Sequence, residues 1–357
     1  MEYLSGLLTL VERSSLFAGK NVHIAVIANP VAGGFKIRKK SNANRAYFQS
    51  AIELVRDRPV VTASCTYVMY CTVSSGHARS LAAIVYNEAK LARNSSDIFL
   101  VVTAGGDGTS LEVQSEFAVS VLLEGNRELV ERVCILRLPF GTGNDGSDGR
   151  TLDETLSLLT GDSKFDFQPA VRVHSVNREI DSLFAFNIAS VGLDAFVTNM
   201  TNRLKKFSPG DFYKIWVDLA CLFYNKIYRV GTLEINPTLE DGKRMQSIRD
   251  RMLLVAMGAS GRRTYGSNQK ILPDDRNVCG VREMPLLRKL KLKSLFKIGK
   301  HVNLPEAVLL SAKKIELQYA EKILMQLDGE THFLYPADFP LVMELTEPFI
   351  RVIRPKI

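Results

Sequence analysis

Apolar runs separated by helix-spaced polar segments fill the N-terminal part of the chain. The runs at residues 22–28, 65–70, 98–102 and 133–138 have the length and the β-branched content of buried strands. Segments with the apolar spacing of helices lie between them, for example over 78–91. Strands that alternate with helices in this way predict βαβ units and a parallel sheet. The loops that follow such strands gather at one edge of the sheet.

The pattern changes after a predicted helix at 152–159. Short alternating runs separated by turns then predict a mostly antiparallel sheet, with a helix near 211–224. The predicted strands are 166–173, 183–189, 230–235, 252–257, 314–317, 324–327, 341–345 and 349–353. The expected fold class is an α/β N-terminal domain with a parallel sheet, followed by a mostly antiparallel, β-rich C-terminal domain. We place the domains at 1–163 and 164–357, with the last residues free to pack back on the first domain.

A glycine turn follows the third predicted strand, which we expect to stop at Thr103 or Ala104. The sequence VVTAGGDGTSLEV then continues into a helix, with Thr109 as the expected N-cap and Glu112 at the spacing of a capping box. Such a turn directs main-chain N–H groups and a helix N-terminus toward one point, where phosphate oxygens bind favourably. Gly106 and Gly108 allow a bulky anion to approach the backbone.

Asp107 is the unusual residue of this turn. A carboxylate among amides that face an anion repels the anion, unless a metal ion or a transferable proton stands between them. The alternative is a plain βα turn in which Asp107 is a local turn former.

Two other loops follow predicted strands, at 29–34 and 141–145. In the second loop, the Thr142 hydroxyl can donate a hydrogen bond, and Asn144 and Asp145 can bond to a nucleotide base or ribose. The chain lacks the GxxxxGK[ST] motif of P-loop enzymes and the HRD and DFG motifs of protein kinases. Phosphate chemistry in this chain therefore has to use glycine turns and main-chain amides.

The composition is that of a soluble protein. The chain has 357 residues, 46% hydrophobic and 24% charged, enough for two domains with their own cores. Its longest apolar candidate, 212–223, contains Lys214 and Asp218 and does not predict a membrane span. The N-terminus lacks the basic start of a signal peptide, and five cysteines without a CxxC pair favour reduced thiols in a cytosol.

The net charge of +8 is concentrated between Arg282 and Lys300, where seven basic residues accompany one acidic residue. Interleaved leucines predict a basic amphipathic helix of the kind that settles on anionic lipid surfaces. The alternative is an ordinary helix with its leucines in the core and its lysines in solvent.

The loops, taken together and in order, resemble the diacylglycerol kinase catalytic fold, which bacterial lipid kinases, sphingosine kinases and ceramide kinases share. GGDGT lies between an upstream NPxxG loop and a downstream PxGTxND loop, and NIASVGLDAFV, KILPDDRNVCGV and QLDGE resemble later motifs of that family. The resemblance covers nearly the whole chain. GGDGT alone also resembles NAD kinases, which share the N-terminal fold, but the PFGTGND loop and the long β-rich half argue against that relationship.

The resemblance implies ATP and Mg²⁺ as cofactors and assigns roles to individual residues. In the resemblance, Glu330 and Asp107 are the catalytic carboxylates, either of which is the proton acceptor, and Asp107 also holds Mg²⁺ with ATP. Asp194 contacts the lipid head group. The alternative interpretation, from composition alone, is that Asp328–Glu330 is a plain hairpin turn and that Asp194 is a surface turn residue. The expected nucleotide-binding residues are Asn29, Pro30, Val31, Ala32, Gly33, Thr72, Gly106, Asp107, Gly108, Thr109, Ser110, Glu112, Thr142 and Asn144.

Three departures from the family pattern stand out. Leu111 replaces an asparagine, Cys279 replaces an aspartate that helps to hold a structural Mg²⁺, and Gly146-Ser147-Asp148 replaces Phe-Ala-Arg. A thiol suits Mg²⁺ poorly, so a second metal site is doubtful. We also expect a more flexible loop that has lost an arginine able to meet phosphate.

We therefore expect an ATP-dependent lipid kinase that phosphorylates a lipid hydroxyl, on diacylglycerol or a sphingoid-type alcohol. It is expected in the cytoplasm, peripherally associated with a membrane surface, without a nucleic-acid partner; its oligomeric state is open and includes a homodimer. The alternatives are a kinase of a soluble acceptor such as NAD, and a nucleotide-binding protein without transfer activity.

Overall fold

The computed structural model describes residues 1–141, 144, 146, 148–177, 182–204, 224–265 and 269–356. The chain forms two compact units, Met1–Gln168 with Pro348–Ile357, and Pro169–Glu347. Within the described part of the chain, none of the helices has the length and apolarity that crossing a membrane requires.

Unit 1 contains a six-stranded sheet in the order β2-β1-β3-β4-β19-β5. Its strands are β1 (Asn21–Ala28), β2 (Ser64–Cys71), β3 (Asp97–Gly105), β4 (Val133–Pro139), β5 (Ser163–Gln168) and β19 (Ile350–Pro355). Its helices are η1 (Glu2–Ser5), α1 (Gly6–Glu12), η2 (Ser15–Phe17), α2 (Gly33–Lys36), α3 (Arg38–Val55), α4 (His77–Leu91), α5 (Asp107–Ala118), the π-helix η3 (Val119–Leu123), α6 (Leu129–Arg132) and α7 (Leu152–Thr160). The pairs β1–β2, β1–β3 and β3–β4 are parallel, as the βαβ pattern predicts.

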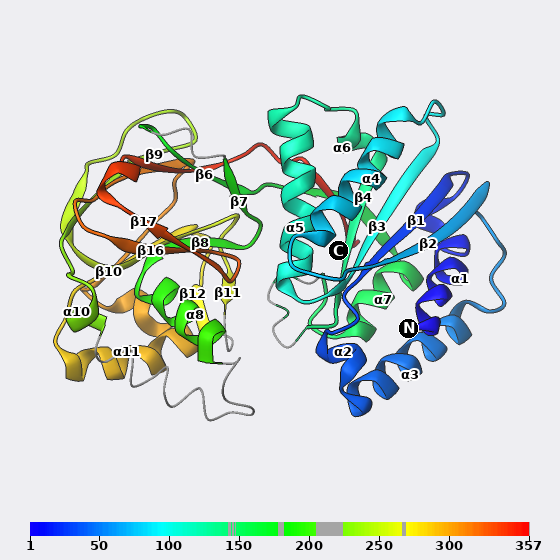
Figure 1. Ribbon diagram of the computed structural model, residues 1–357, viewed down its shortest axis with the longest axis horizontal. Coiled ribbons are helices and arrows are strands. Elements are labelled where there is room, and N and C mark those ends of the chain that lie inside the picture. Colours follow the sequence, from blue (N-terminus) through cyan, green and yellow to red (C-terminus); the bar gives the residue numbers. More distant parts are fainter. Residues whose placement is uncertain are drawn as a thin grey trace. The chain divides into compact units, whose positions relative to one another are not determined.

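Helices cover both faces of this sheet. α4, α5 and α6 pack on one face, and α1, α3 and α7 on the other (Figure 1). The central strands β1, β3 and β4 are therefore almost entirely buried, which explains their continuous apolar runs.

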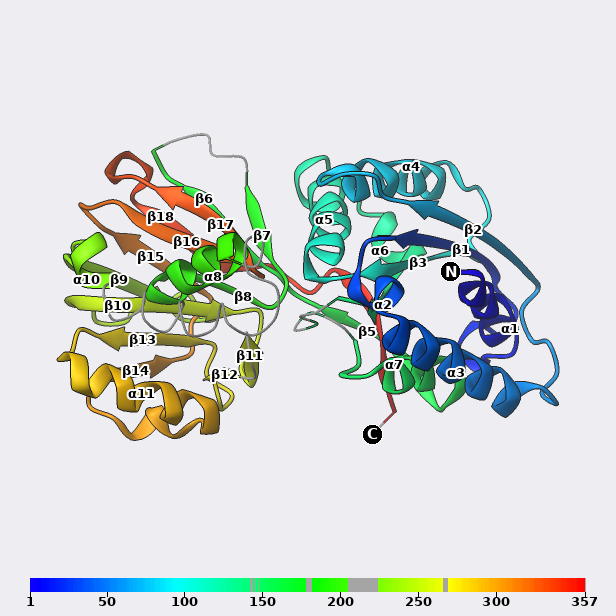
Figure 2. The same ribbon diagram turned by 60° about the horizontal axis from the view of Figure 1, so that its bottom comes forward.

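Unit 2 is a mostly antiparallel sheet with helices against it. Its main path runs β17-β16-β8-β10-β9-β15-β18-β6-β7, and α8 packs on β8, β16 and β17 (Figure 2). The strands are β6 (Val171–Ser175), β7 (Leu183–Ala185), β8 (Ile188–Gly192), β9 (Thr232–Thr238), β10 (Ile248–Gly258), β11 (Arg263–Tyr265), β12 (Gln269–Leu272), β13 (Val278–Arg282), β14 (Ala307–Leu310), β15 (Lys314–Gln318), β16 (Ile323–Leu327), β17 (Glu330–Leu334) and β18 (Leu341–Leu345). The helices are α8 (Leu193–Leu204), α10 (Tyr224–Ile227), α11 (Leu286–Ile298), η4 (Lys300–Asn303) and η5 (Pro336–Asp338).

The predicted fold class, a parallel α/β domain with a β-rich antiparallel domain, is confirmed. Two strand predictions were too long: 166–173 is divided between β5 and β6, and 183–189 between β7 and β8. The first division occurs because β5 pairs with β19 in unit 1, whereas β6 pairs with β18 in unit 2. The sheet of unit 1 thus includes β5, beyond residue 163, and the returning strand β19. Most of the helix expected near 211–224 lies outside the described residues.

Candidate active site

The loops of unit 1 meet where its parallel strands end. The Thr72 N–H, after β2, donates to the Ala28 carbonyl of β1 at 2.9 Å, and the Asn29 N–H, after β1, donates to the Ala104 carbonyl of β3 at 2.9 Å. The Phe140 N–H, after β4, donates to Gly105 O at 3.1 Å. The strand-end loops are therefore joined directly by main-chain hydrogen bonds.

The loop at 29–33 is a tight turn held by its own first residue. Asn29 Oδ1 accepts from the Val31 N–H at 3.1 Å, and the Asn29 carbonyl accepts from the Ala32 N–H at 3.0 Å. Gly34 then approaches Phe140, and its N–H donates to the Phe140 carbonyl at 2.7 Å. A Cβ at Gly34 would lie 2.7 Å from a Phe140 ring carbon, so this approach requires glycine.

The glycine turn after β3 differs from prediction at both ends. β3 continues to Gly105, and α5 begins at Asp107 with Gly106 as its N-cap. Thr109 is therefore inside the helix, and the predicted capping box is wrong. Thr109 packs so closely on Gly105 that a Cβ there would lie 2.5 Å from the Thr109 hydroxyl oxygen.

Glu112 instead caps the neighbouring helix. Its carboxylate accepts from the N–H groups of Gly76 and Ala78, at 2.8 and 3.0 Å, at the start of α4. The same loop is fixed by His77, whose Nδ1 accepts from the Val73 N–H at 3.2 Å. Glu112 therefore orders the loop after Thr72.

The N-terminus of α5 has the electrostatic character of an anion site. The amides of Gly108 and Thr109 precede the first hydrogen bond of the turn, which the Ser110 N–H donates to the Gly106 carbonyl at 3.2 Å. A Cβ on Gly106 would lie 3.4 Å from Gly141 Cα, so the two glycine loops approach each other backbone to backbone. A side chain at Gly106 would fill this approach, and glycine leaves it open to a phosphate.

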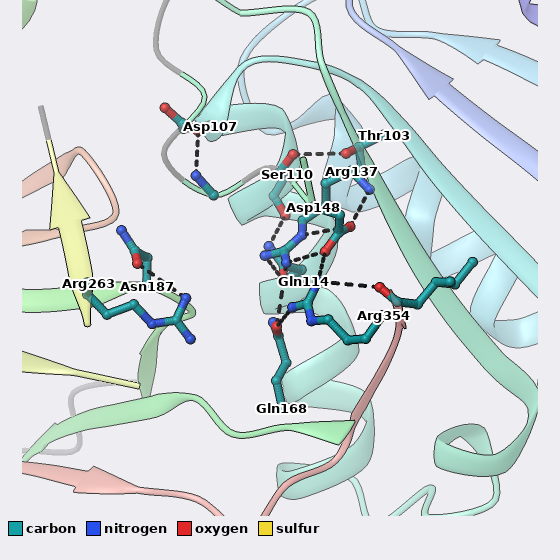
Figure 3. Close-up of polar contacts among 12 residues, drawn as sticks. Thr103, Asp107, Ser110, Gln114, Arg137, Asp148, Gln168, Asn187, Arg263 and Arg354 are labelled. Atoms are coloured by element: carbon teal, nitrogen blue, oxygen red, sulfur yellow. Dashed lines mark hydrogen bonds and ion pairs between the residues drawn. The ribbon is translucent and has the colours of Figure 1, made fainter. Parts of the chain in front are cut away.

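Asp107 lies on the first turn of α5 and is partly exposed. One oxygen of its carboxylate accepts from the Gly146 N–H at 3.2 Å (Figure 3). The loop after β4 thus orients the acidic side chain expected to work with Mg²⁺.

Beneath this loop, unit 1 contains a buried polar network that the sequence interpretation missed. Arg137 Nη2 pairs with Asp148 Oδ1 at 2.7 Å, and the Arg137 N–H donates to Asp148 Oδ2 at 2.8 Å (Figure 3). Arg354 of β19 reaches the same carboxylate at 2.9 Å. Gln114 accepts from Arg137 at 3.2 Å and donates to the Ser110 carbonyl at 3.2 Å, so the network extends to the first turns of α5.

Asp148, the last residue of the segment that we expected to be more flexible, is therefore anchored to β4, whereas Ser147 lies outside the described residues. Burial alone would raise the pKa of the Asp148 carboxyl, but the Arg137 guanidinium and its hydrogen bonds, together with Arg354, hold this pKa below its usual range. A sequence signal for the network existed, because Arg137 interrupts the apolar strand VCILRLP and a buried charge requires a buried partner.

Asn144 bonds to Gly141 of the same loop. Its Oδ1 accepts from the Gly141 N–H at 2.9 Å, and its Nδ2 donates to the Gly141 carbonyl at 3.4 Å. Thr142, the other predicted nucleotide contact of this loop, lies outside the described residues.

In unit 2, the predicted proton acceptor Glu330 is exposed at the start of β17. It follows a tight hairpin turn, in which Asp328 has φ 47° and Gly329 has φ 98°. The carboxylate of the half-buried Asp328 accepts from the N–H groups of Phe186, Asn187 and Ile188, at 2.5 to 3.2 Å. The DGE motif is thus the hairpin that composition suggests, but with Asp328 locked to the start of β8.

Asp194, the predicted head-group residue, is 3% exposed in the first turn of α8, so its interpretation as a surface turn residue is wrong. Its carboxylate accepts from the Ser190 hydroxyl. Burial raises the pKa of Asp194 to about 6, against the opposing effect of the Ser190 bond.

Metal-binding groups are few in the described residues, where no three His, Cys, Asp or Glu side chains gather as a metal site. Cys279 is buried in β13, and burial raises the pKa of its thiol to about 12, which makes it a poor Mg²⁺ ligand. Asp107 fits Mg²⁺ in another way. This ion is commonly held by one or two carboxylates together with substrate phosphates, and Asp107 lies on the turn whose amides suit phosphate.

The basic segment forms α11, from Leu286 to Ile298. Leu287 and Ile298 are 77% and 54% exposed, whereas Phe296 is buried. The helix therefore presents apolar as well as basic side chains to solvent.

Comparisons with known proteins agree with these features. The sequence profile described as "Diacylglycerol kinase catalytic domain" matches residues 23–157. A diacylglycerol kinase of Bacillus subtilis (strain 168) is 24% identical over 285 residues, which cover 74% of this chain and 82% of that protein. A diacylglycerol kinase of Staphylococcus carnosus (strain TM300) is 26% identical over 254 residues, with 68% and 74% covered.

Solved structures from another bacterium share the fold. A crystal structure of a candidate diacylglycerol kinase from Bacillus anthracis strain Sterne matches with a TM-score of 0.58 at 18% identity, covering 92% of this chain and 94% of that one. A second structure from that strain, of a diacylglycerol kinase, has a TM-score of 0.50 at 16% identity, covering 92% and 96%. The profile match over residues 23–157 and the curated relatives together support the diacylglycerol kinase catalytic-domain family for this chain.

Proposed function

We propose that this protein is an ATP-dependent lipid kinase that transfers the γ-phosphoryl group of ATP to a lipid hydroxyl, on diacylglycerol or a sphingoid-type alcohol. The observation that carries the proposal is the N-terminus of α5, where the amides of Gly108 and Thr109 and the open backbone of Gly106 meet the other strand-end loops. The names of the curated relatives support the acceptor class.

Each residue of the glycine turn has a defined task in this proposal. The amides of Gly108 and Thr109 bind phosphate oxygens, and the bare backbone at Gly106 lets the phosphate approach. The Asp107 carboxylate would hold Mg²⁺ that arrives with ATP. When bound, that ion neutralises charge on the phosphates. Loops 29–33 and 72–76 flank the turn and would line the nucleotide.

The transfer step requires one proton acceptor. The lipid oxygen forms a bond to the γ-phosphorus, the bond from that phosphorus to the bridging oxygen breaks, and ADP leaves. We assign the hydroxyl proton to a carboxylate oxygen of Glu330, which is exposed on a rigid hairpin. The reverse assignment gives the proton to Asp107 and the metal contact to Glu330.

The acceptor lipid places the reaction at a membrane surface. α11 suits that location, because its exposed Leu287 and Ile298 accompany a basic sequence. We therefore propose peripheral contact with anionic lipid, and the five cysteines without a CxxC pair favour the cytoplasm.

The decisive experiment supplies ATP labelled in its γ-phosphate with a panel of acceptors. Diacylglycerol, sphingoid alcohols and ceramide would be presented in mixed micelles, and NAD in solution, with and without Mg²⁺. We expect label in one lipid product and only with Mg²⁺. Label in NADP would identify a soluble-acceptor kinase. ATP binding without any labelled product would identify a nucleotide-binding protein and would contradict the proposal.

A further inference from the structure

A line of hydrogen bonds inside unit 2 joins Asp194 to the hairpin that carries Glu330. The Gly329 N–H donates to Gln326 Oε1 at 2.9 Å, and Gln326 Nε2 donates to Ser190 Oγ at 2.9 Å. The Ser190 hydroxyl then donates to Asp194 Oδ2. Gln326 and Ser190 are direct cross-strand partners of β16 and β8, which places their side chains in contact.

The direction of every bond in this line is fixed by chemistry. A main-chain N–H only donates and an ionised carboxylate only accepts, so Gln326 must present its oxygen to Gly329 and its NH₂ to Ser190. The Ser190 proton is then left for Asp194. Ser190 is 0% and Gln326 2% exposed, so water does not compete for these bonds.

The hairpin turn is also held from two other sides. The Asp328 carboxylate is bound to the start of β8, and Asn202 of α8 donates to the Gly329 carbonyl at 2.9 Å. Asn199 of the same helix donates to the Thr331 hydroxyl at 3.2 Å. The main chain on both sides of Glu330 is therefore fixed by α8, by β8 and by the line through Gln326.

Asp194 enters this arrangement with one oxygen unused. Its Oδ1 is shielded from solvent and has no donor in hydrogen-bonding geometry among the residues that the structure describes; the main-chain N–H groups of Asp194 and Ala195 lie near the carboxylate. A buried acceptor without a donor is costly, so a ligand that supplies a donor there gains more than it would at the surface. A hydroxyl or an ammonium group on a lipid head group is such a donor.

We propose that Ser190 and Gln326 are positioning residues that fix the Asp194 carboxylate and the Glu330 hairpin relative to each other. In this proposal the Asp194 carboxylate receives the head group of the lipid acceptor. The proposal rests on the proposed function. The Ser190 hydroxyl donates to Oδ2 of Asp194, and Oδ1 of Asp194 is left for the substrate. Gln326 fixes Gly329, and with it the start of β17, so both side chains set the geometry without touching the substrate.

The two residues give different kinetic signatures. Gln326→Leu keeps a similar shape but releases Gly329, and should lower kcat for the lipid at least about tenfold with KM for ATP nearly unchanged. Ser190→Ala frees Asp194 Oδ2 and should chiefly raise KM for the lipid, by about fivefold or more. The two losses should combine to much less than their product, since either change interrupts the same line.

Asn277 supplies the matched control. It is 6% exposed in the same unit, and its side-chain amide exchanges two hydrogen bonds with Ala312, at 2.9 and 3.0 Å. Asn277→Leu makes the same kind of amide-to-alkyl change as Gln326→Leu and should cost comparable stability. It should leave kcat and KM for the lipid near their original values.

The outcomes separate this inference from the proposed function. If the wild-type protein phosphorylates no lipid, the proposed function is wrong. An active wild type in which Gln326→Leu behaves like Asn277→Leu, at matched folded fractions, would overturn the positioning roles. If the activity losses of the two single variants multiply in the double variant, Ser190 and Gln326 do not act through one line of hydrogen bonds. If Gln326→Leu does not fold, wild-type kinetics for Ser190→Ala would overturn the positioning roles instead.

Discussion

The Arg137 guanidinium and the Asp148 carboxylate form a buried ion pair with a nitrogen–oxygen distance of 2.7 Å and side-chain exposures of 6% and 0%. Asp148 ends the loop whose Gly146 N–H bonds to Asp107. The charge pair therefore fixes Asp148, at the end of a segment in which the sequence has lost an arginine of the family pattern.

Asp148→Asn should destabilise the protein by about 3–5 kcal/mol, because it leaves the buried Arg137 charge without its anion. Urea unfolding of both proteins measures the difference. Asp162→Asn, in an exposed pair with Lys356, is the control and should cost less than about 1 kcal/mol. An Asp148→Asn cost as small as that of the control would refute the anchoring role.

The contribution of Asp148 should also depend on pH in a defined direction. Its folded-state pKa is lowered, so its stabilisation is fully present above the unfolded pKa of about 3.9 and is lost as pH falls through the folded value. The stability gap between wild type and Asp148→Asn should be constant near neutrality and shrink in acid. A gap that is already shrinking at neutral pH would contradict this assignment.

Gly106→Ala should separate ATP binding from folding. Gly106 has φ −97°, which any residue adopts, and a Cβ would lie at 3.4 Å from Gly141 Cα, so the fold should survive. The added methyl occupies the backbone approach proposed for phosphate, and ATP affinity by calorimetry should fall at least about tenfold. Gly280→Ala, whose Cβ would make ordinary contacts at 3.7 Å or more in unit 2, should leave ATP affinity unchanged.

Glu112→Ala should destabilise the start of α4. Two N–H groups lose their carboxylate acceptor, and a lost helix cap of this kind costs about 0.5–2 kcal/mol. Glu112→Gln, which keeps one acceptor oxygen, should cost less. Hydrogen exchange of the Gly76 and Ala78 amides provides the direct measurement, and unchanged protection in Glu112→Ala would exclude the cap.

Asp107→Ala and Glu330→Ala should each lower turnover of the lipid at least about tenfold while the fold survives. Neither side chain is buried, so circular dichroism and unfolding midpoints should change little. Glu347→Ala, at an exposed pair with Lys313, is the control for removal of a carboxylate. Wild-type rates in either active-site variant would remove that residue from the mechanism.

The parallel sheet was predictable because its strands are buried on both faces and read as unbroken apolar runs, as in Ile98–Val102. The gathering of the strand-end loops followed from the topology alone. The order of the motifs indicated the family, which the profile match and the curated relatives bear out.

Features set by distant partners were not predictable. The predicted capping box at Thr109 is wrong because Gly106 is the N-cap and the Glu112 carboxylate accepts a hydrogen bond at the start of α4. No local sequence pattern reveals this partner. Asp148 depends on Arg137 and on Arg354, near the opposite end of the chain. The burial of Asp194 depends on how α8 packs against β8 and β16, which composition does not encode.

The returning strand β19 has a consequence for biosynthesis. It pairs with β4 and β5 and delivers Arg354 to Asp148, so unit 1 lacks an interior strand of its sheet until residues 348–357 leave the ribosome. Unit 2 is complete in sequence before that moment and is free to fold first. We therefore expect unit 1, although most of it is translated before unit 2, to complete its fold last.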